Sequence, residues 1–167
     1  MTPIRTLLYC LTASAVLGCH PTSQAPATNS FKEDIATHMI VKKESSFSAG
    51  ETIDRLENIL KSKGLTIFTR VNHAAGAKNV GIDMTDSELI IFGNPKLGTP
   101  LMLENPQMGL DLPLKALAYT DASGQTYLTY TAPATLQDRH DISENTGIIA
   151  KMTGALDAMT SAAVSQD

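Results

Sequence analysis

The 167-residue chain contains no tryptophan, and aromatic residues make up only 5% of it. Proteins that stack nucleic-acid bases need several aromatic side chains on one surface, which this composition does not favour. Charged residues are also few, at 18%, and the formal net charge is −4. The 13 lysines and arginines are scattered, whereas nucleic-acid-binding domains gather them on one face. We therefore expect no nucleic-acid partner.

The sequence has only two cysteines, Cys10 and Cys19, and both lie near its beginning. One positive charge at Arg5 precedes an apolar run over 7–17, which has the length of a signal-peptide core and is too short to span a bilayer. The run ends at Gly18-Cys19 and looks like a bacterial lipobox. We predict a lipoprotein signal peptide over 1–18 and acylation of Cys19, which would anchor the mature chain in membrane lipid. The alternative is a secretory signal peptide cleaved elsewhere.

If Cys10 is removed with the signal peptide and Cys19 is acylated, the folded domain has no free thiol. We then expect no disulfide, no cysteine nucleophile and no cysteine-ligated metal. Residues 20–30 are polar and lack periodicity, which is typical of a flexible tether, here placed over 19–36. Position 20 is His rather than Asp, a pattern that looks like sorting to the outer membrane, facing the periplasm. A single domain over 37–167 would follow.

Hydrophobic periodicity and turn residues give the elements of this domain. A helix over 49–63 is predicted because Ser48 and Glu51 form a capping box and apolar residues follow at helical spacing up to Gly64. An amphipathic pattern over 143–163 predicts a second long helix at the end of the chain. Residues 121–124 (DASG) are typical of a hairpin turn. Strands are expected over 37–44, 65–71, 88–93, 114–120 and 125–131, with short helical turns over 72–78 and from Pro133 toward His140.

The order strand, helix, four strands, helix predicts an α+β domain. It would consist of an antiparallel sheet of about five strands with helices on one face. The other face of the sheet would need a cover, so we expect a homodimer.

Between the third and fourth expected strands lies a long stretch, 93–113, that is punctuated by glycine and proline. Breakers occur at Gly93-Asn94-Pro95 and again at Gly98-Thr99-Pro100, and a short helix is expected near 97–104. Loops of this length are often functional. The other interpretation is a structural loop that covers the core.

Several short motifs follow one another in a characteristic order along the chain: His73–Lys78 (HAAGAK), Phe92–Pro95 (FGNP), Gly98–Met102 (GTPLM), Leu112–Leu114 (LPL) and Arg139-His140. Together they resemble the bacterial family called domain of unknown function 302, over roughly 39–140. The resemblance implies a fold like that of the TATA-box-binding protein, often dimeric, without the DNA binding of that protein. It also implies that lipoprotein and fusion forms occur, and it implies no established activity.

Strand order places the residues that could form one binding site. In an antiparallel meander, Asn94 and Thr99 of the long stretch, Asp111 at its end, and Arg139 and His140 after the fifth strand come close together. Glycines allow backbone amides to approach a bound group, and Arg139 offers a forked set of donors. We therefore hypothesise a site for a small anionic or carbonyl-rich ligand. His73 would lie far from Asn94 and join the site only through the following crossover or from a dimer partner.

The sequence supplies no pattern for a metal, a cofactor or a catalytic residue. No two histidines stand four apart, and the H-E-x-x-H, C-x-x-C, G-x-S-x-G and phosphate-loop motifs are absent. The expected function is that of a non-enzymatic envelope lipoprotein that binds a small ligand or a protein partner. One alternative is an enzyme that uses His73 or His140 as acid or base. Another is a structural or assembly protein that acts through dimer contacts.

Overall fold

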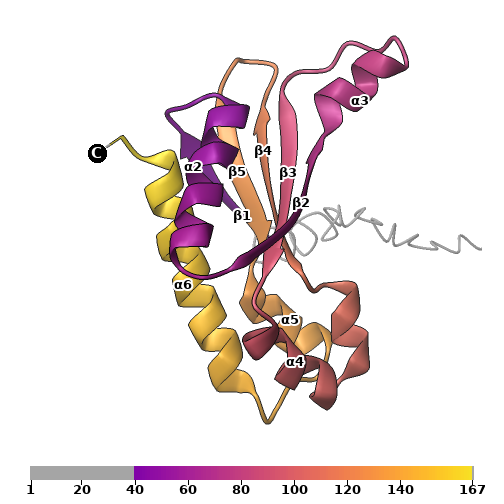
Figure 1. Ribbon diagram of the computed structural model, residues 1–167, viewed down its shortest axis with the longest axis vertical. Helices are drawn as coiled ribbons and strands as arrows, with labels where there is room; N and C mark the ends of the chain where they lie inside the picture. Colours follow the sequence, from indigo (N-terminus) through magenta and orange to yellow (C-terminus); the bar gives the residue numbers. More distant parts are fainter. Residues whose placement is uncertain (1–39, 167) are drawn as a thin grey trace, which may run out of the picture.

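The computed structural model describes residues 40–166, so the predicted signal peptide, Cys19 and the tether lie outside the described residues. The core of the fold is a five-stranded antiparallel sheet in the order β1-β5-β4-β3-β2 (Figure 1). The predicted α+β class is confirmed. The strands are β1 (Ile40–Ser45), β2 (Thr66–Asn72), β3 (Ser87–Gly93), β4 (Leu114–Thr120) and β5 (Thr126–Thr131). The helices are α2 (Ala49–Ser62), α3 (His73–Asn79), α4 (Pro95–Glu104), the 3₁₀ helix η1 (Pro106–Leu110), α5 (Pro133–Arg139) and α6 (Thr146–Val164).

Helix α2 begins at the residue that the sequence predicted and ends at Ser62, one residue before the predicted end. The hydroxyl of Ser48 accepts a hydrogen bond from the Glu51 amide at 3.3 Å, which satisfies one of the free amides of the first turn. Gly64, with φ of 76°, follows the last turn in a conformation that costs a glycine little. Three residues at helical spacing, Ile53, Leu56 and Leu60, are fully buried against the sheet.

The β4–β5 hairpin also follows the prediction. The Asp121 carboxylate accepts hydrogen bonds from the amides of Ser123 and Gln125 at 2.9 and 3.1 Å, and Gly124 has φ of 87°. Beyond the turn, alternate residues such as Ala118 and Leu128 are buried.

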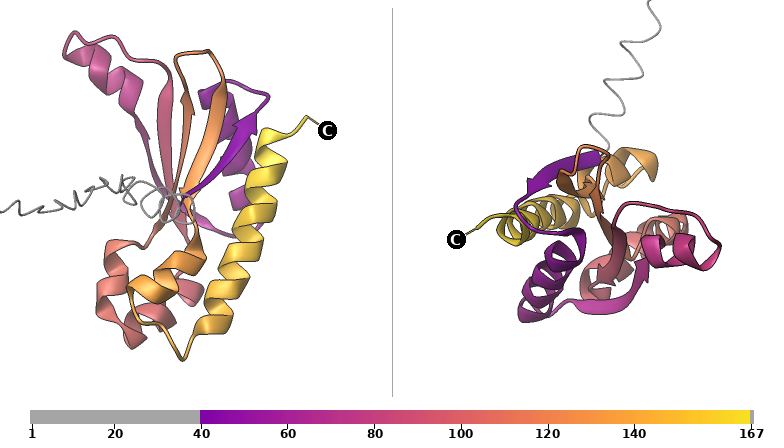
Figure 2. Two further views of the ribbon diagram at one scale, coloured as in Figure 1. Left: turned by 180° about the vertical axis from the view of Figure 1, so that it is seen from behind. Right: turned by 90° about the horizontal axis from the view of Figure 1, so that it is seen from above.

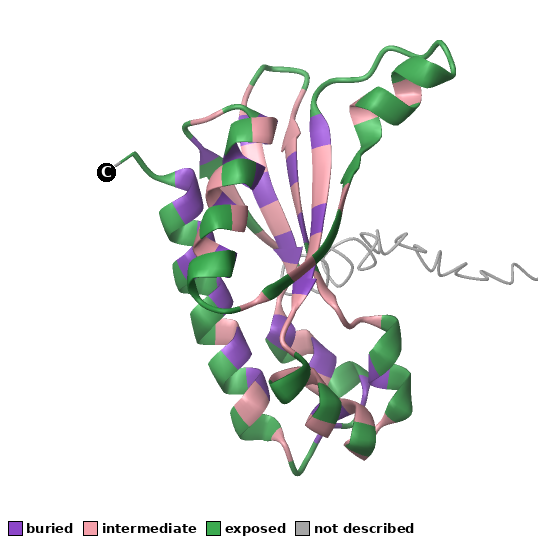
Figure 3. Ribbon diagram, viewed as in Figure 1, coloured by how far each residue is buried: buried purple, intermediate pink, exposed green. Residues whose placement is uncertain are grey.

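Helices α2 and α6 cover one face of the sheet, and α6 continues beyond its end (Figures 1 and 2). There it packs on α5, near α4 and η1. The described residues thus form two hydrophobic clusters, which we call the sheet core and the helical core. Leu156 of α6 belongs to the sheet core, and Ile149 of the same helix belongs to the helical core. Figure 3 shows the buried positions along α6 in both halves. Helix α6 therefore joins the two cores.

The stretch 93–113 is mostly helical, so the expectation that Gly98-Thr99-Pro100 breaks the chain is wrong. Helix α4 runs from Pro95 through Pro100 to Glu104. Proline lacks the amide that would bond to the carbonyl four residues earlier, at Lys96, but Lys96 is exposed and water can satisfy that carbonyl. Leu101, next to Pro100, is fully buried in the helical core, and this packing outweighs the local preference.

Helix α3 and the chain that follows it project from the sheet as an arm, defined as residues 73–86 (Figure 1). The side chain of Asn72 accepts a hydrogen bond from the Ala75 amide at 2.7 Å and so caps α3. No residue of α3 is buried. Within residues 40–166, no helix is both long enough and apolar enough to cross a membrane.

Candidate ligand-binding site

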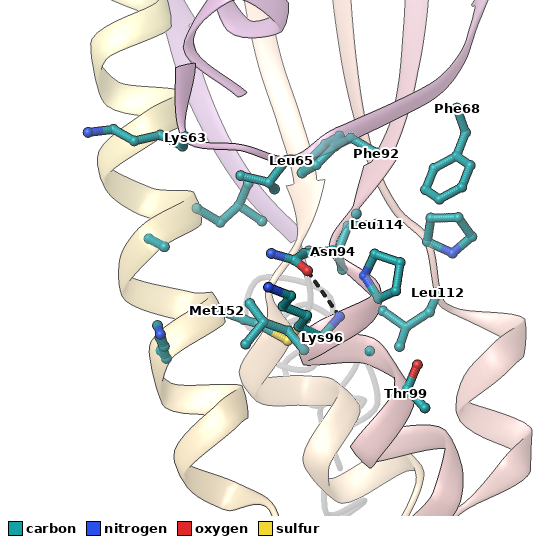
Figure 4. Close-up of a pocket in the computed structure, with 18 of the residues that line it drawn as sticks. Lys63, Leu65, Phe68, Phe92, Asn94, Lys96, Thr99, Leu112, Leu114 and Met152 are labelled. Atoms are coloured by element: carbon teal, nitrogen blue, oxygen red, sulfur yellow. Dashed lines mark hydrogen bonds between the residues drawn. The ribbon is translucent and has the colours of Figure 1, made fainter. Parts of the chain in front are cut away.

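A cavity of about 830 Å³ lies where the sheet meets the helices beyond its end (Figure 4). Its walls come from the ends of β3 and β4, from α4 and η1, and from one side of α6. The volume is in the range of pockets that hold small molecules in other proteins. Solvent reaches the cavity on one side, because lining residues such as Thr99 and Ala155 are exposed.

Most of the cavity lining is apolar, and it draws on both cores. Phe92 and Leu156 belong to the sheet core, Met152 belongs to the helical core, and Leu114 packs against both. The cavity is therefore the junction that α6 spans.

Two glycines keep the cavity walls close together. A Cβ atom at Gly98 of α4 would lie 3.3 Å from Cδ1 of Leu112, tighter than an ordinary contact. A Cβ atom at Gly93 would lie 3.5 Å from Cε2 of Phe68 and from Cβ of Pro113. The glycines that the sequence marked as breakers thus allow α4 to approach the chain before β4.

The charged side chains that line the cavity are all lysines, namely Lys63, Lys96 and Lys151. They come from three elements: the C-cap of α2, the first turn of α4 and the middle of α6. Among residues 40–166, no aspartate or glutamate lines the cavity, and none of these three lysines belongs to an ion pair. The cavity therefore combines an apolar lining with uncompensated positive charge.

Two of the residues predicted from the sequence, Asn94 and Thr99, line this cavity (Figure 4). The Asn94 side-chain oxygen accepts a hydrogen bond from the Lys96 amide at 3.0 Å and so caps α4. Asn94 thus stabilises the start of α4 and also forms part of the cavity wall.

Three others, Asp111, Arg139 and His140, form a separate cluster that does not line the cavity. One carboxylate oxygen of Asp111 lies 2.8 Å from Nη1 of Arg139, and the other lies 2.6 Å from Nε2 of His140. Burial alone would raise the pKa of Asp111, but hydrogen bonds from His140 and Arg139 outweigh this effect and hold the pKa below its usual value. The positive charge of Arg139 is therefore already compensated by a carboxylate.

His140 is only 4% exposed, and its carbonyl accepts a hydrogen bond from the Asn105 side chain at 2.9 Å. Its Nδ1 atom is buried and has no hydrogen-bond partner in the described part of the chain. The ring therefore links η1 to α5 and does not reach the cavity.

His73 lies at the opposite end of β3 from Asn94. Asn72, just before it, pairs with Glu88 at the start of β3, whereas Gly93 at the end of that strand pairs with Thr66. His73 is exposed at the beginning of the arm. The structure thus brings Asn94 and Thr99 together, groups Asp111, Arg139 and His140 elsewhere, and leaves His73 apart from both.

Sequence reasoning missed the three lysines and the cavity-lining methionines, Met102, Met152 and Met159. A single lysine on a helix normally indicates a solvent-facing position. The one local signal is on α6, where Lys151, Ala155 and Ala158 recur at spacings of four and three and mark a side of the helix without large side chains. Among residues 40–166, no group of three or more His, Cys, Asp or Glu side chains is placed to hold a metal ion.

Residues 41–159 match the sequence model of the family described as domain of unknown function DUF302. The chain belongs to this family. A crystal structure of an uncharacterized conserved DUF302 protein from Bacillus stearothermophilus has a similar fold, with a TM-score of 0.68 and 24% identity over 75% of this chain and 98% of that one. The family predicted from the motifs is thereby confirmed, and at this identity the similar structure supports the fold alone.

Two curated relatives are fluoride-specific ion channels FluC 1, from Brucella suis biovar 1 and Brucella abortus biovar 1. Each is 48% identical to this chain over 117 residues, which is 69% of this chain. The matched part makes up 46% of the first relative and 43% of the second. This chain therefore spans less than half the length of these relatives.

Proposed function

We propose that this DUF302 domain is a non-enzymatic binding domain for a small, largely apolar ligand, held at the bacterial envelope through acylated Cys19. The observation that carries the proposal is the cavity of about 830 Å³ at the junction of the two cores. An apolar surface that faces water is unfavourable by about 25 cal/mol per Å², so an apolar ligand that covers it gains that free energy.

The cavity chemistry supports binding rather than catalysis. Its lining, as formed by the described residues, contains no histidine, carboxylate, serine or cysteine side chain, so general acid-base or nucleophilic chemistry would fall to the lysines and Thr99. A catalytic base or nucleophile is normally oriented by a second polar group. The two histidines considered from the sequence lie elsewhere, His140 in the Asp111 cluster and His73 on the arm.

Two independent observations support a place at a membrane. The sequence carries a lipobox-like Gly18-Cys19 after a short apolar run, followed by a polar segment of tether-like composition. Both Brucella relatives are ion channels, which are membrane proteins, and they share the matched stretch with this chain. An outer-membrane position facing the periplasm is part of the proposal and rests on His20.

Methionine methyl groups offer a direct test. Met102, Met152 and Met159 line the cavity, whereas Met84 lies on the arm and Met108 lies inside the helical core. With ¹³C-methyl-labelled methionine, a bound apolar probe such as dodecanol should shift the three cavity signals in a saturable way. The signal of Met84, on the arm, serves as the internal control.

A pair of substitutions on one helix completes the test. Ala155 is exposed on the cavity side of α6, so Ala155→Phe should fill the cavity without disturbing either core. Ala150→Phe introduces the same side chain at another exposed position of α6 that does not line the cavity. We expect the first change to abolish the saturable shifts and the second to leave them intact. Equal shifts in both variants, or no shifts in the unmodified chain, would contradict a binding function at this cavity.

A protein partner, including a second copy of this chain, is the second candidate, and the arm favours it. Val80, Ile82 and Met84 are 71%, 61% and 51% exposed, although each is a large apolar residue. If the arm forms the contact of a homodimer, Val80→Glu with Ile82→Glu should convert a dimer to a monomer in sedimentation equilibrium. Leu103→Glu with Leu110→Glu, at residues 80% and 81% exposed on α4 and η1, is the matched control. A monomeric unmodified chain would contradict the dimer.

A further inference from the structure

We propose that the cavity recognises an amphipathic anion: a hydrocarbon chain that lies along the apolar walls and a carboxylate or phosphate head that lies among Lys63, Lys96 and Lys151. This inference rests on the proposed ligand-binding function and specifies its ligand. The evidence is the combination of an apolar lining with charges of one sign.

The positive lining contrasts with the chain as a whole. The formal net charge is −4, yet the cavity lining contains three lysines and, among the described residues, no carboxylate. Two of the five described lysines outside the lining are paired with acids: Lys43 lies 2.7 Å from Asp157, and Lys61 contacts Glu57. Charges of one sign at the mouth of a low-dielectric cavity raise the local concentration of counter-ions. The cavity therefore attracts anions even though the protein as a whole repels them.

The three lysines that line the cavity are exposed and so lie at its edge, whereas the apolar lining residues Phe92, Leu156 and Met159 are buried. Figure 4 shows Lys63 at the edge of the cavity with its amine directed away from it, and Lys96 beside Asn94. Lysine side chains are long and flexible, and each carries a compact charge with three rotatable donors. Such groups can bend toward a carboxylate or phosphate at the opening while their carbon stems extend the apolar wall.

The inner walls suit a hydrocarbon chain. Phe92, Leu156 and Met159 line the cavity and are buried in the sheet core, where few polar groups could bind a sugar or a peptide. Three methionines contribute to the lining, and their flexible thioethers adapt to ligands of varying shape. A compact, purely polar anion would leave these walls in contact with water, and a neutral hydrocarbon would leave the lysines unused.

Ligands that share one hydrocarbon chain but carry different head groups distinguish an amphipathic anion from an apolar ligand of any charge. The purified full chain is titrated with dodecanoate, dodecanol and dodecylammonium below their micelle-forming concentrations, and the methionine methyl signals are followed. We expect dodecanoate to bind tightest and dodecylammonium weakest. Shortening dodecanoate to decanoate should weaken binding by about fourfold for each CH₂ removed. Raising the salt concentration to about 1 M, where the Debye length is about 3 Å, should bring dodecanoate close to dodecanol.

Neutralising the lysines tests whether the charges that line the cavity bind the anionic head group. Lys63→Gln, Lys96→Gln and Lys151→Gln combined should weaken dodecanoate binding by roughly threefold to a hundredfold, since each exposed ion pair contributes between about 1.4-fold and fivefold. The same variant should leave dodecanol binding unchanged. The matched control combines Lys42→Gln, Lys61→Gln and Lys78→Gln, which makes the same change in net charge at residues outside the cavity lining. All six lysines are exposed, so both variants should fold.

The outcomes are distinguishable. Equal binding of dodecanoate and dodecanol, or equal losses in the two triple variants, would overturn the amphipathic anion while leaving an apolar ligand site in place. The absence of binding by every probe would overturn the proposed function itself. A monoacyl glycerol phosphate compared with dodecanoate then separates a membrane-derived lipid from a free fatty acid, and tighter binding of either one supports the shared chemistry.

Discussion

The carboxylate of Asp111 lies 2.6 Å from Nε2 of His140 and connects the end of η1 to the end of α5. Both residues are candidates for ligand binding on sequence grounds, yet in the structure they bind each other. Arg139 adds a second contact to the same carboxylate at 2.8 Å. The pair therefore fixes η1, whose Gly109 lines the cavity, to α5.

Replacing Asp111 should cost stability. Asp111→Ala would leave the buried His140 ring without its partner and Arg139 without its counter-charge, and we expect a loss of about 1–3 kcal/mol in the free energy of unfolding. Urea denaturation monitored by circular dichroism measures the loss. Asp138→Ala, at an exposed residue of α5 outside the ion pairs of the described residues, is the control and should change stability by less than about 0.5 kcal/mol. An equal effect of both changes would argue against the structural role of Asp111.

The stability of the domain should also depend on pH through Glu104. The amides of Glu144, Ser143 and Asn145 and the Asn145 side chain donate hydrogen bonds to its carboxylate, with the Glu144 and Asn145 amides at 2.8 and 3.0 Å. The Glu144 amide is the largest of the influences that lower the pKa of Glu104 to about 2 from 4.5. Because the folded-state pKa is the lower one, this carboxylate stabilises the fold fully above about pH 4.5, and the contribution is lost as the pH falls toward 2.

Glu104→Gln keeps the shape of the side chain and removes its charge. The difference in unfolding free energy between the unmodified chain and this variant should be largest at neutral pH and shrink between pH 4.5 and 2. Urea titrations at several pH values follow this difference. A difference that does not vary with pH would show that charge is not what joins α4 to the start of α6.

Alanine substitutions at a buried and an exposed leucine should differ in their effect on stability. Leu156 of α6 is 1% exposed, and Leu156→Ala should cost about 2–5 kcal/mol because it leaves a cavity in the sheet core. Leu110 of η1 is 81% exposed, and Leu110→Ala should cost less than about 0.5 kcal/mol. Denaturant midpoints of the two variants provide the measurement. A small effect at Leu156 would mean that α6 does not contribute to the core.

The predicted lipid anchor depends on one residue outside the described part of the chain. Cys19→Ala should abolish incorporation of radiolabelled palmitate and release the mature protein from the membrane fraction, since acylation needs the thiol. Cys10→Ala, within the predicted signal peptide, is the matched control and should be labelled normally. Labelled, membrane-bound protein from the Cys19→Ala variant would refute the anchor.

The sequence was most informative where structure depends on neighbouring residues. The Ser48 cap, the stripe of α2 and the turn at Asp121 each follow from side chains within a few positions of one another, and each was predicted within a residue or two. A short helix was expected near 97–104, but Gly98-Thr99-Pro100 was also expected to break the chain. The helix continues through Pro100 because Leu101 is buried in the helical core, and no local pattern shows that burial.

The site was predicted only in part for a related reason. Strand order correctly placed 133–140 beside the stretch that follows β3, but it could not say which side chains turn toward each other. Asp111 lies close enough to Arg139 and His140 to bind both, so these three side chains bind one another and are not free to bind a ligand. The three lysines come from elements far apart in the sequence, so only the packed fold brings them to one cavity.

Helix α6 also restricts how the chain length of this domain can vary. Ile149 and Ala163 lie in different cores on one uninterrupted helix, about 21 Å apart at 1.5 Å per residue. One inserted residue between them would rotate the two ends by about 100° relative to each other, because a helical turn contains 3.6 residues. One set of apolar side chains would then face water. Insertions and deletions among relatives should therefore fall in the arm or the turns, while this segment of α6 keeps a fixed length.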